Sequence, residues 1–250
     1  MRTTSGLTMV IDSGLPTGAF TDVVTSHGEY IDLVKFGWGT ALVTRDLARK
    51  TRVLAEAGIG FYFGGTLFEH HVWTDRLDEY LRLVEDTGAT HIEVSNGTIP
   101  LDQHSKAEYV RRMSRYRPVL SEVGYKDSGR SARLTPADWV GALREDLDAG
   151  AFLVITEARE SGRSGIAQAD GHVRGDVLDA VIGNLDTDRV LFEAPTKDLQ
   201  VELITALGPG VNLGNIATHD VIALETLRRG LRGDTLLALA TGADRLPSAA

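Results

Sequence analysis

The chain has 250 residues, of which 42% are hydrophobic and 24% are charged, so it can bury a large core and is not mainly disordered. It contains no cysteine, which excludes a disulfide framework, a thiolate nucleophile and a Cys-ligated metal. The 26 basic and 35 acidic residues give a net charge of −9, so we expect no nucleic-acid partner. No apolar segment is long enough for a signal peptide or a membrane span, which predicts a cytoplasmic protein with no membrane partner.

Short apolar segments rich in β-forming residues recur along the whole chain. They are apolar almost throughout rather than alternating, which is typical of parallel strands covered on both faces. Their starts lie roughly 20 to 40 residues apart, which is the spacing of repeated βα units. The predicted strands are Leu7–Ile11, Tyr30–Phe36, Gly60–Phe63, His91–Val94, Pro118–Val123, Phe152–Thr156, Val190–Phe192 and Val211–Leu213.

Segments with apolar residues at helical spacing lie between these strands. Two of them, Thr44–Ala57 and Thr74–Thr87, end just before a glycine, which is a typical helix stop. A third begins at Thr135 with a capping residue, a proline and an acidic first turn, and is expected to run to Gly150. The remaining predicted helices are Asp176–Leu185, Asp198–Leu207 and Asp220–Arg229.

This alternation of strands and helices predicts an α/β fold. No linker divides the chain, so we expect residues 1–250 to form a single domain. The sequence has neither a glycine-rich dinucleotide loop after the first strand nor a P-loop. We therefore favour a closed (β/α)8 TIM barrel over an open, doubly wound sheet.

Polar residues end nearly every predicted strand. Catalytic residues of (β/α)8 barrels come from the carboxyl-terminal strand ends, so these positions are a candidate site. Burying several carboxylates requires compensation, either by ion pairs that only stabilise the barrel or by a hard divalent cation such as Mg²⁺. We favour the functional interpretation, but spacing alone does not rank the glutamates. The candidate carboxylates are Asp12, Glu69, Glu93, Glu122, Glu157 and Glu193, and the candidate cations are Lys35, Lys126 and Arg159.

Some glycines near the strand ends could place backbone N–H groups against an anion, although tight turns explain them equally well. Gly39 follows the second strand and Gly65 follows the third. Barrel enzymes commonly bind phosphate after strands seven and eight, which here indicates Gly214 and Asn215. The planar guanidinium of Arg159 is expected to bind the same phosphate.

These strand-end segments resemble the phosphosulfolactate synthase family, whose members add sulfite to phosphoenolpyruvate on the way to coenzyme M or sulfolactate. They cover nearly the whole chain in the family's order, and KFGWGT (35–40) and GGTLFE (64–69) are specific. The resemblance implies a (β/α)8 barrel, Mg²⁺ dependence, a phosphoenolpyruvate-like anionic substrate and a homo-oligomer. The matching segments are 7–15, 30–40, 64–69, 92–98, 121–126, 146–162, 190–195, 211–217 and 225–235.

The expected site combines the resemblance with the strand-end residues above. The positions that match residues kept polar around the family's phosphoenolpyruvate pocket are Lys35, Glu69, Glu122, Lys126, Glu157, Arg159 and Glu193. The residues expected to be catalytic are Lys126, Lys35 and Glu157. A lysine with a lowered pKa could protonate C2 of the substrate, and we expect Lys126 to be that acid. The expected substrate and phosphate ligands are Arg159, Gly39, Gly65, Gly214 and Asn215. The expected metal ligands are Glu69, Glu122, Glu193 and Asp12.

The chain departs from the family's pattern at two positions. Ser13 stands where the family usually has lysine, and Asn96 stands where it usually has aspartate. The two changes are interpreted as a Lys–Asp pair exchanged for neutral groups, and they bear on the nucleophile more than on the fold. Two alternatives therefore stay open. One is a related barrel enzyme that adds a different nucleophile to phosphoenolpyruvate or to another enolpyruvyl substrate, and the other is a non-catalytic anion-binding protein.

Overall fold

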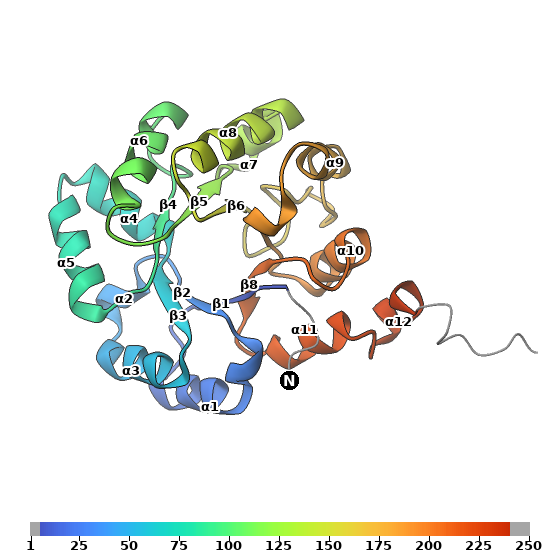
Figure 1. The fold of residues 1–250 in the computed structure, drawn as a ribbon, viewed down its shortest axis with the longest axis horizontal. Helices are drawn as coiled ribbons and strands as arrows, with labels where there is room; N and C mark the ends of the chain where they lie inside the picture. The colour runs from blue at the N-terminus through green and yellow to red at the C-terminus, as the bar shows by residue number, and fades with distance from the viewer. Residues whose placement is uncertain (1–5, 241–250) are drawn as a thin grey trace, which may run out of the picture.

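The computed structural model describes residues 6–240, which form a barrel of eight parallel strands surrounded by helices (Figure 1). The strand order is β3-β2-β1-β8-β7-β6-β5-β4, so that β1 pairs with both β2 and β8. The strands are β1 (Thr8–Asp12), β2 (Leu33–Phe36), β3 (Gly60–Phe63), β4 (Ile92–Val94), β5 (Val119–Val123), β6 (Leu153–Thr156), β7 (Val190–Glu193) and β8 (Leu213–Ala217). The predicted (β/α)8 fold is confirmed.

The barrel is nearly closed between β3 and β4. No strand ladder joins these two strands within residues 6–240, but the N–H groups of Thr90 and His91 both donate to the carbonyl oxygen of Phe61, at 2.9 and 3.4 Å. These bonds hold the segment before β4 against β3. The carboxyl ends of all eight strands therefore surround one mouth.

The helices lie outside the sheet (Figure 1). The predicted helix start at Thr135 is confirmed, because Thr135 and Asp138 form a capping box and Pro136 is the first helical residue. None of the described helices is long and apolar enough to cross a membrane. The helices are α1 (Thr17–His27), α2 (Thr40–Val43), α3 (Leu47–Ala57), α4 (Gly65–Trp73), α5 (Leu77–Thr87), α6 (Gln103–Met113), α7 (Ser128–Arg133), α8 (Pro136–Asp148), α9 (Gly175–Asn184), α10 (Lys197–Leu207), α11 (Val221–Arg228) and α12 (Gly233–Leu239), with 3₁₀ turns η1 (Gly28–Tyr30) and η2 (Thr187–Arg189).

The last strand differs from its prediction. It was expected at Val211–Leu213 but begins at Leu213 and continues through Gly214 and Asn215. A Cβ on Gly214 would lie only 2.9 Å from Met9 Cε, so the glycine lets this strand approach the barrel interior closely. The pairing of β1 with β8 also shifts register here, which marks an irregularity that apolar patterning does not reveal.

Successive side chains of a strand point to opposite faces, so every second residue of each strand points into the barrel. These inward side chains form an apolar layer below and a charged layer above. The lower layer is apolar and includes Met9, Leu33, Tyr62, Leu120, Leu153, Ile155 and Leu191. Four of these apolar residues are each followed, two positions later on the same strand face, by a charged residue. Lys35 follows Leu33, Glu122 follows Leu120, Glu157 follows Ile155 and Glu193 follows Leu191. A larger apolar cluster lies between the strands and the helices. The fold therefore supports a charged layer at the mouth on an apolar floor.

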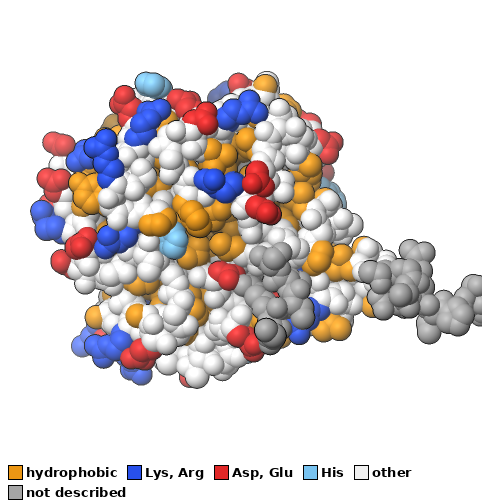
Figure 2. All heavy atoms as spheres, viewed as in Figure 1, with side chains coloured by type: hydrophobic (Ala, Val, Ile, Leu, Met, Phe, Trp, Pro, Cys, Tyr) orange, Lys and Arg blue, Asp and Glu red, His pale blue; other side chains and the backbone are white. Residues whose placement is uncertain are grey.

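The outer surface follows the pattern expected of helices that cover a barrel. Charged side chains are spread around the periphery of the face in Figure 2, and hydrophobic ones gather nearer its centre. Apolar helix positions face the sheet and polar positions face solvent, as in other amphipathic surface helices. The buried charges at the mouth therefore differ from the charged residues of this outer surface.

Candidate active site

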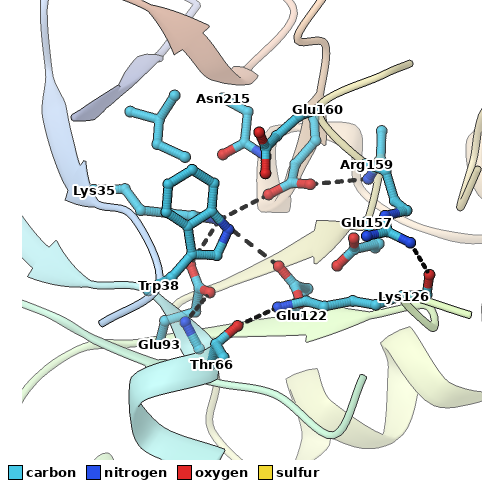
Figure 3. A pocket seen from close by; sticks show the side chains of 15 residues that line it. Lys35, Trp38, Thr66, Glu93, Glu122, Lys126, Glu157, Arg159, Glu160 and Asn215 are labelled. Carbon is cyan, nitrogen blue, oxygen red and sulfur yellow. Dashed lines mark hydrogen bonds and ion pairs between the residues drawn. The ribbon is translucent and has the colours of Figure 1, made fainter. Parts of the chain in front are cut away.

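Lys35 lies at the floor of the mouth and contacts three carboxylates (Figure 3). Its Nζ is 2.8 Å from Glu193 Oε1, 3.3 Å from Glu93 Oε2 and 3.7 Å from Glu122 Oε2. All four residues are buried. They belong to β2, β7, β4 and β5, so closure of the barrel, rather than local sequence, brings them together.

The charges of this cluster do not balance, since one ammonium faces three carboxylates. Burial alone would lower the pKa of Lys35, but Glu193, Glu93 and Glu122 outweigh it and raise that pKa well above its usual range. Burial raises the pKa of Glu93 to about 7, against the opposing effect of Lys35. Burial also raises the pKa of Glu193. The cluster is short of positive charge.

Glu122, Glu157 and Glu193 form a group of buried carboxylates that could hold a metal ion. One oxygen from each lies within 4.8 Å of the others. Glu122 Oε1 and Glu157 Oε2 are buried and accept no hydrogen bond from an N–H or hydroxyl group of the described residues. A hydrogen bond between these two carboxyl groups requires that Glu157 keep its proton. Burial, followed by the carboxylates of Glu122 and Glu193, raises the pKa of Glu157 well above its usual range. Oxygen-only ligands with surplus negative charge fit a hard divalent cation such as Mg²⁺.

Lys126 reaches the same pocket from the loop after β5, and its ammonium donates a hydrogen bond to Thr66 Oγ1. Burial alone would lower its pKa, but the carboxylates of Glu122, Glu157 and Glu69 outweigh burial and raise it. The expectation of a lowered pKa is therefore wrong. The neighbouring carboxylates therefore make Lys126 a weaker acid than an ordinary lysine, and it is protonated at neutral pH.

One pocket collects these groups and encloses about 460 Å³ of space, including its opening to solvent. Arg159 Nη1 donates to the Lys126 carbonyl oxygen at 2.9 Å, so the two cations are anchored to each other (Figure 3). The charged lining consists of Lys35, Lys126 and Arg159 with Glu93, Glu122, Glu157, Glu160 and Glu193. Three cations suit an anionic ligand with several oxygens, and five carboxylates favour a metal cation beside it.

Asp12, a predicted metal ligand, does not point into this pocket. Ile11 lines the pocket, and the next side chain along β1 points to the opposite face. There Asp12 Oδ2 lies 2.5 Å from Lys50 Nζ, and Oδ1 accepts the N–H groups of Gly14 and Leu15 at 2.9 and 2.7 Å. We therefore correct its assignment from metal ligand to an ion pair that joins β1 to α3.

Glu69 is also separate from the group of three carboxylates. It lies on α4, and its Oε1 accepts a hydrogen bond from Ser95 Oγ at 2.5 Å. Its Oε2 accepts the N–H groups of Thr98 and Ile99, both at 2.8 Å. Both oxygens are occupied by protein donors, so the expectation that Glu69 joins the metal site is not kept. Instead, Glu69 orders the loop after β4.

The predicted phosphate ligands are only partly brought together. Arg159, Gly65 and Asn215 line the pocket, whereas Gly39 and Gly214 are not among its lining residues. The N–H group of Gly65 is occupied, because it donates to Glu93 Oε1 at 2.5 Å. Asn215 Oδ1 is buried without a hydrogen-bond partner among the described residues. Gly214 serves packing against Met9, so its assignment as a phosphate ligand is corrected.

The two departures from the family pattern lie outside the pocket. Ser13 is exposed and lines a separate surface hollow beside α2. Asn96 is buried, and its Nδ2 donates to the carbonyl oxygen of Leu101 at 2.9 Å. They line different hollows, so the interpretation of an exchanged Lys–Asp pair is not supported.

Several lining residues were not among the predicted site residues, and for two of them, Trp38 and Thr66, the sequence held a signal. Trp38 and Thr66 lie in segments 35–40 and 64–69, whose letters resemble the family most specifically. Neither is charged, and reasoning from charged strand ends passes over them. Their positions within those two segments would have identified them.

A family model and curated relatives that are 42–47% identical to the chain indicate one family. The family described as (2R)-phospho-3-sulfolactate synthase (ComA) matches residues 2–234. The phosphosulfolactate synthase of Bacillus subtilis (strain 168) is 47% identical over 232 residues, covering 92% of each chain. The phosphosulfolactate synthase of Methanocaldococcus jannaschii is 43% identical over 234 residues, covering 92% of this chain and 93% of the relative. A crystal structure of 3-hexulose-6-phosphate synthase is similar in fold, with a TM-score of 0.56, 16% identity, and coverage of 94% of this chain and 100% of that chain.

Proposed function

The chain belongs to the (2R)-phospho-3-sulfolactate synthase family, an enzyme family that forms a carbon–sulfur bond, and from this premise we propose that it adds sulfite to phosphoenolpyruvate. The observation that carries the proposal is the single pocket in which Lys35, Lys126 and Arg159 meet five glutamates. Phosphoenolpyruvate presents a phosphate and a carboxylate, and both need cationic partners in a buried site.

In the proposed reaction the sulfur lone pair of sulfite forms a bond to C3 of phosphoenolpyruvate. The electron pair of the C2–C3 double bond moves toward C1, and the carboxylate takes up the negative charge. A proton then forms a bond to C2, and the carboxylate regains its ordinary form. The protein must therefore bind the phosphate, stabilise charge on the carboxylate and hold one proton near C2.

The residues of the pocket match these three tasks. Arg159 supplies a guanidinium for the phosphate at the outer side of the pocket. Lys35 is fixed by its carboxylate partners and places a positive charge at the floor. Lys126 lines the pocket beside Glu122 and Glu157, and its Nζ carries a proton at neutral pH. We assign Lys126 as the proton donor to C2.

A divalent cation fits the group of Glu122, Glu157 and Glu193, since their oxygens lie close together and two of them accept no hydrogen bond from an N–H or hydroxyl group of the described residues. We propose that these three residues hold Mg²⁺. When bound, the ion would add stabilisation of the negative charge that develops on the substrate carboxylate. Glu157 must then give up the proton that its raised pKa retains, so binding should be weaker at low pH.

No specific observation now favours a nucleophile other than sulfite. The two residues that raised it, Ser13 and Asn96, lie outside the lining of the pocket. Neither change removes a charge from the groups that would contact the substrate. We therefore keep sulfite as the proposed nucleophile.

The proposal is tested by mixing the protein with phosphoenolpyruvate, sulfite and MgCl₂ and following the loss of enolpyruvyl absorbance. We expect turnover that requires all three components and stops with EDTA. Phosphorus NMR should show one new phosphate ester in place of phosphoenolpyruvate. Consumption of phosphoenolpyruvate without sulfite, or no consumption under any of these conditions, would contradict the proposal.

A further inference from the structure

The backbone of Trp38 adopts an unusual conformation at the edge of the pocket. Its φ is 48°, in the left-handed region that bulky side chains rarely enter. Only two other non-glycine residues in the described part of the chain have positive φ, and one of them, Asn215, lines the same pocket. Asparagine tolerates this conformation, whereas tryptophan does not. Such strain persists where the surrounding structure enforces it, often at functional sites.

The turn that carries Trp38 is held from both neighbouring strands. The N–H of Gly37 donates to the carbonyl oxygen of Asp12 at 2.9 Å, and the N–H of Gly64 donates to that of Phe36 at 2.9 Å. Thr40 closes the turn, since its N–H and its Oγ1 both donate to the carbonyl oxygen of Gly37, at 3.0 and 2.7 Å. The position of Trp38 at the mouth is therefore fixed by the barrel rather than by its own conformational preference.

Among the described residues, Trp38 contributes the only aromatic ring to the lining of this pocket, which is otherwise mostly charged. In Figure 3 it lies on one side of the pocket, with Glu157 and Arg159 on the other. This arrangement follows from topology, because Trp38 follows β2, and β6 lies across the barrel from β2. The indole therefore supplies an apolar surface on this side of the pocket, next to Lys35 and Glu93.

We propose that the indole of Trp38 covers one face of the planar enolpyruvyl group and so limits protonation of C2 to the opposite face. This inference rests on the proposed function and deepens it. After sulfite adds to C3, C2 is trigonal, and the face that receives the proton decides the configuration of the product. A closed face excludes both water and acids from that side. Trp38 is thus a positioning residue that sets the stereochemical outcome.

The test compares Trp38→Gly and Trp38→Phe with the wild-type enzyme. Glycine accepts a positive φ, so the Trp38→Gly variant should fold and should melt at no lower temperature than wild type. We expect it to raise KM for phosphoenolpyruvate about 3- to 10-fold, the usual effect of losing an aromatic contact. We also expect chiral chromatography to detect the second C2 epimer in its product and only one in the wild-type product. Trp38→Phe should retain more of the selectivity.

Indole emission gives a second readout that does not depend on turnover. Phosphoenolpyruvate with Mg²⁺ should change the tryptophan emission of the wild type and of a control, Trp73→Phe, in which an exposed ring at the far end of α4 is replaced. The change should be lost in Trp38→Phe.

The outcomes separate this inference from the proposed function. Turnover with a single epimer and unchanged KM in Trp38→Gly would overturn the inference and leave the function intact. An emission change that requires Trp38, in a protein without sulfite-dependent turnover, would support the indole wall and contradict the function. Neither turnover nor an emission change would contradict both.

Discussion

Lys35 determines the charge balance of the pocket. One ammonium cannot neutralise the three carboxylates around it, so protons or a second cation must take up the remaining charge. The pKa values of Glu93, Glu157 and Glu193 are all raised, so when no ligand is bound these carboxyl groups keep their protons to higher pH than an ordinary glutamate. A bound metal ion would replace those protons, which links metal affinity to pH.

Glu93 should make the stability of the metal-free protein depend on pH. Its pKa rises from 4.5 to about 7 on folding, so between these values the folded protein binds more protons than the unfolded chain. Its contribution to the free energy of unfolding is full below pH 4.5 and is lost as pH rises through about 7. As the pH is raised from 5 to 8, the free energy of unfolding should fall less in Glu93→Gln than in wild type, and we expect this difference to be on the order of 1–3 kcal/mol. Urea unfolding in EDTA measures this difference, and equal losses in both proteins would contradict the assignment.

Lys126 should matter for chemistry more than for binding. Replacing it with alanine removes the proposed proton donor, so kcat should fall by roughly 10²–10⁴-fold while KM for phosphoenolpyruvate changes much less. Lys197→Ala is the matched control, because that lysine lies half-exposed on α10 and pairs with Asp234. Steady-state kinetics of the three proteins decide the matter. Near-wild-type turnover of Lys126→Ala would move the proton donor to Lys35.

Strand β1 shows which parts of the site could be read from the sequence. Its existence follows from a short apolar segment, and its neighbours in the barrel follow from repeated βα spacing. Its terminal Asp12 was nevertheless misassigned, because adjacent residues of a strand face opposite sides and only Ile11 faces the pocket. Lys35 lies two residues after the inward-facing Leu33, and Glu193 lies two residues after the inward-facing Leu191, so this spacing indicates which charged residues point into the barrel. Applying the alternation strictly would have separated the inward glutamates from Asp12.

Two buried ion pairs join the helices to the barrel and to each other. Lys50 of α3 pairs with Asp12 of β1 at 2.5 Å, and Lys106 of α6 pairs with Asp146 of α8 at 2.7 Å. Lys106 Nζ also donates to the carbonyl oxygen of Glu122 at 2.8 Å, which supports the strand that carries this proposed metal ligand. Neither lysine was among the predicted site residues, since their partners are distant in sequence.

Removing Lys50 should therefore destabilise the protein strongly. Lys50→Met leaves the carboxylate of Asp12 buried without its cation, and we expect a loss of about 3–5 kcal/mol in the free energy of unfolding. Lys197→Met breaks a half-exposed pair at 2.9 Å and should cost only about 0–1 kcal/mol. Urea unfolding of both variants measures the contrast. Similar small losses would show that the buried pair does not hold α3 to β1.

Across the whole molecule, the fold was more predictable than the site. Seven of the eight predicted strands overlap the observed ones closely because apolar patterning and turn residues are local signals. The contacts of Lys35 with Glu93, Glu122 and Glu193 exist only once the barrel closes, and the pKa values follow from those contacts. The direction of the pKa shift of Lys126 could not be predicted either, because its carboxylate neighbours are also brought to it only by the folded barrel. The homo-oligomer and the cytoplasmic location stay predictions.

The central claim is that one barrel mouth binds phosphoenolpyruvate and a divalent cation together. A crystal structure of the protein with MgCl₂ and phosphoenolpyruvate tests this most directly. We predict a metal ion about 2.0–2.1 Å from oxygens of Glu122, Glu157 and Glu193, with the substrate phosphate near Arg159 and the enolpyruvyl plane against Trp38. Substrate or metal bound only elsewhere on the molecule, with Lys35 and its three carboxylates undisturbed, would contradict the account.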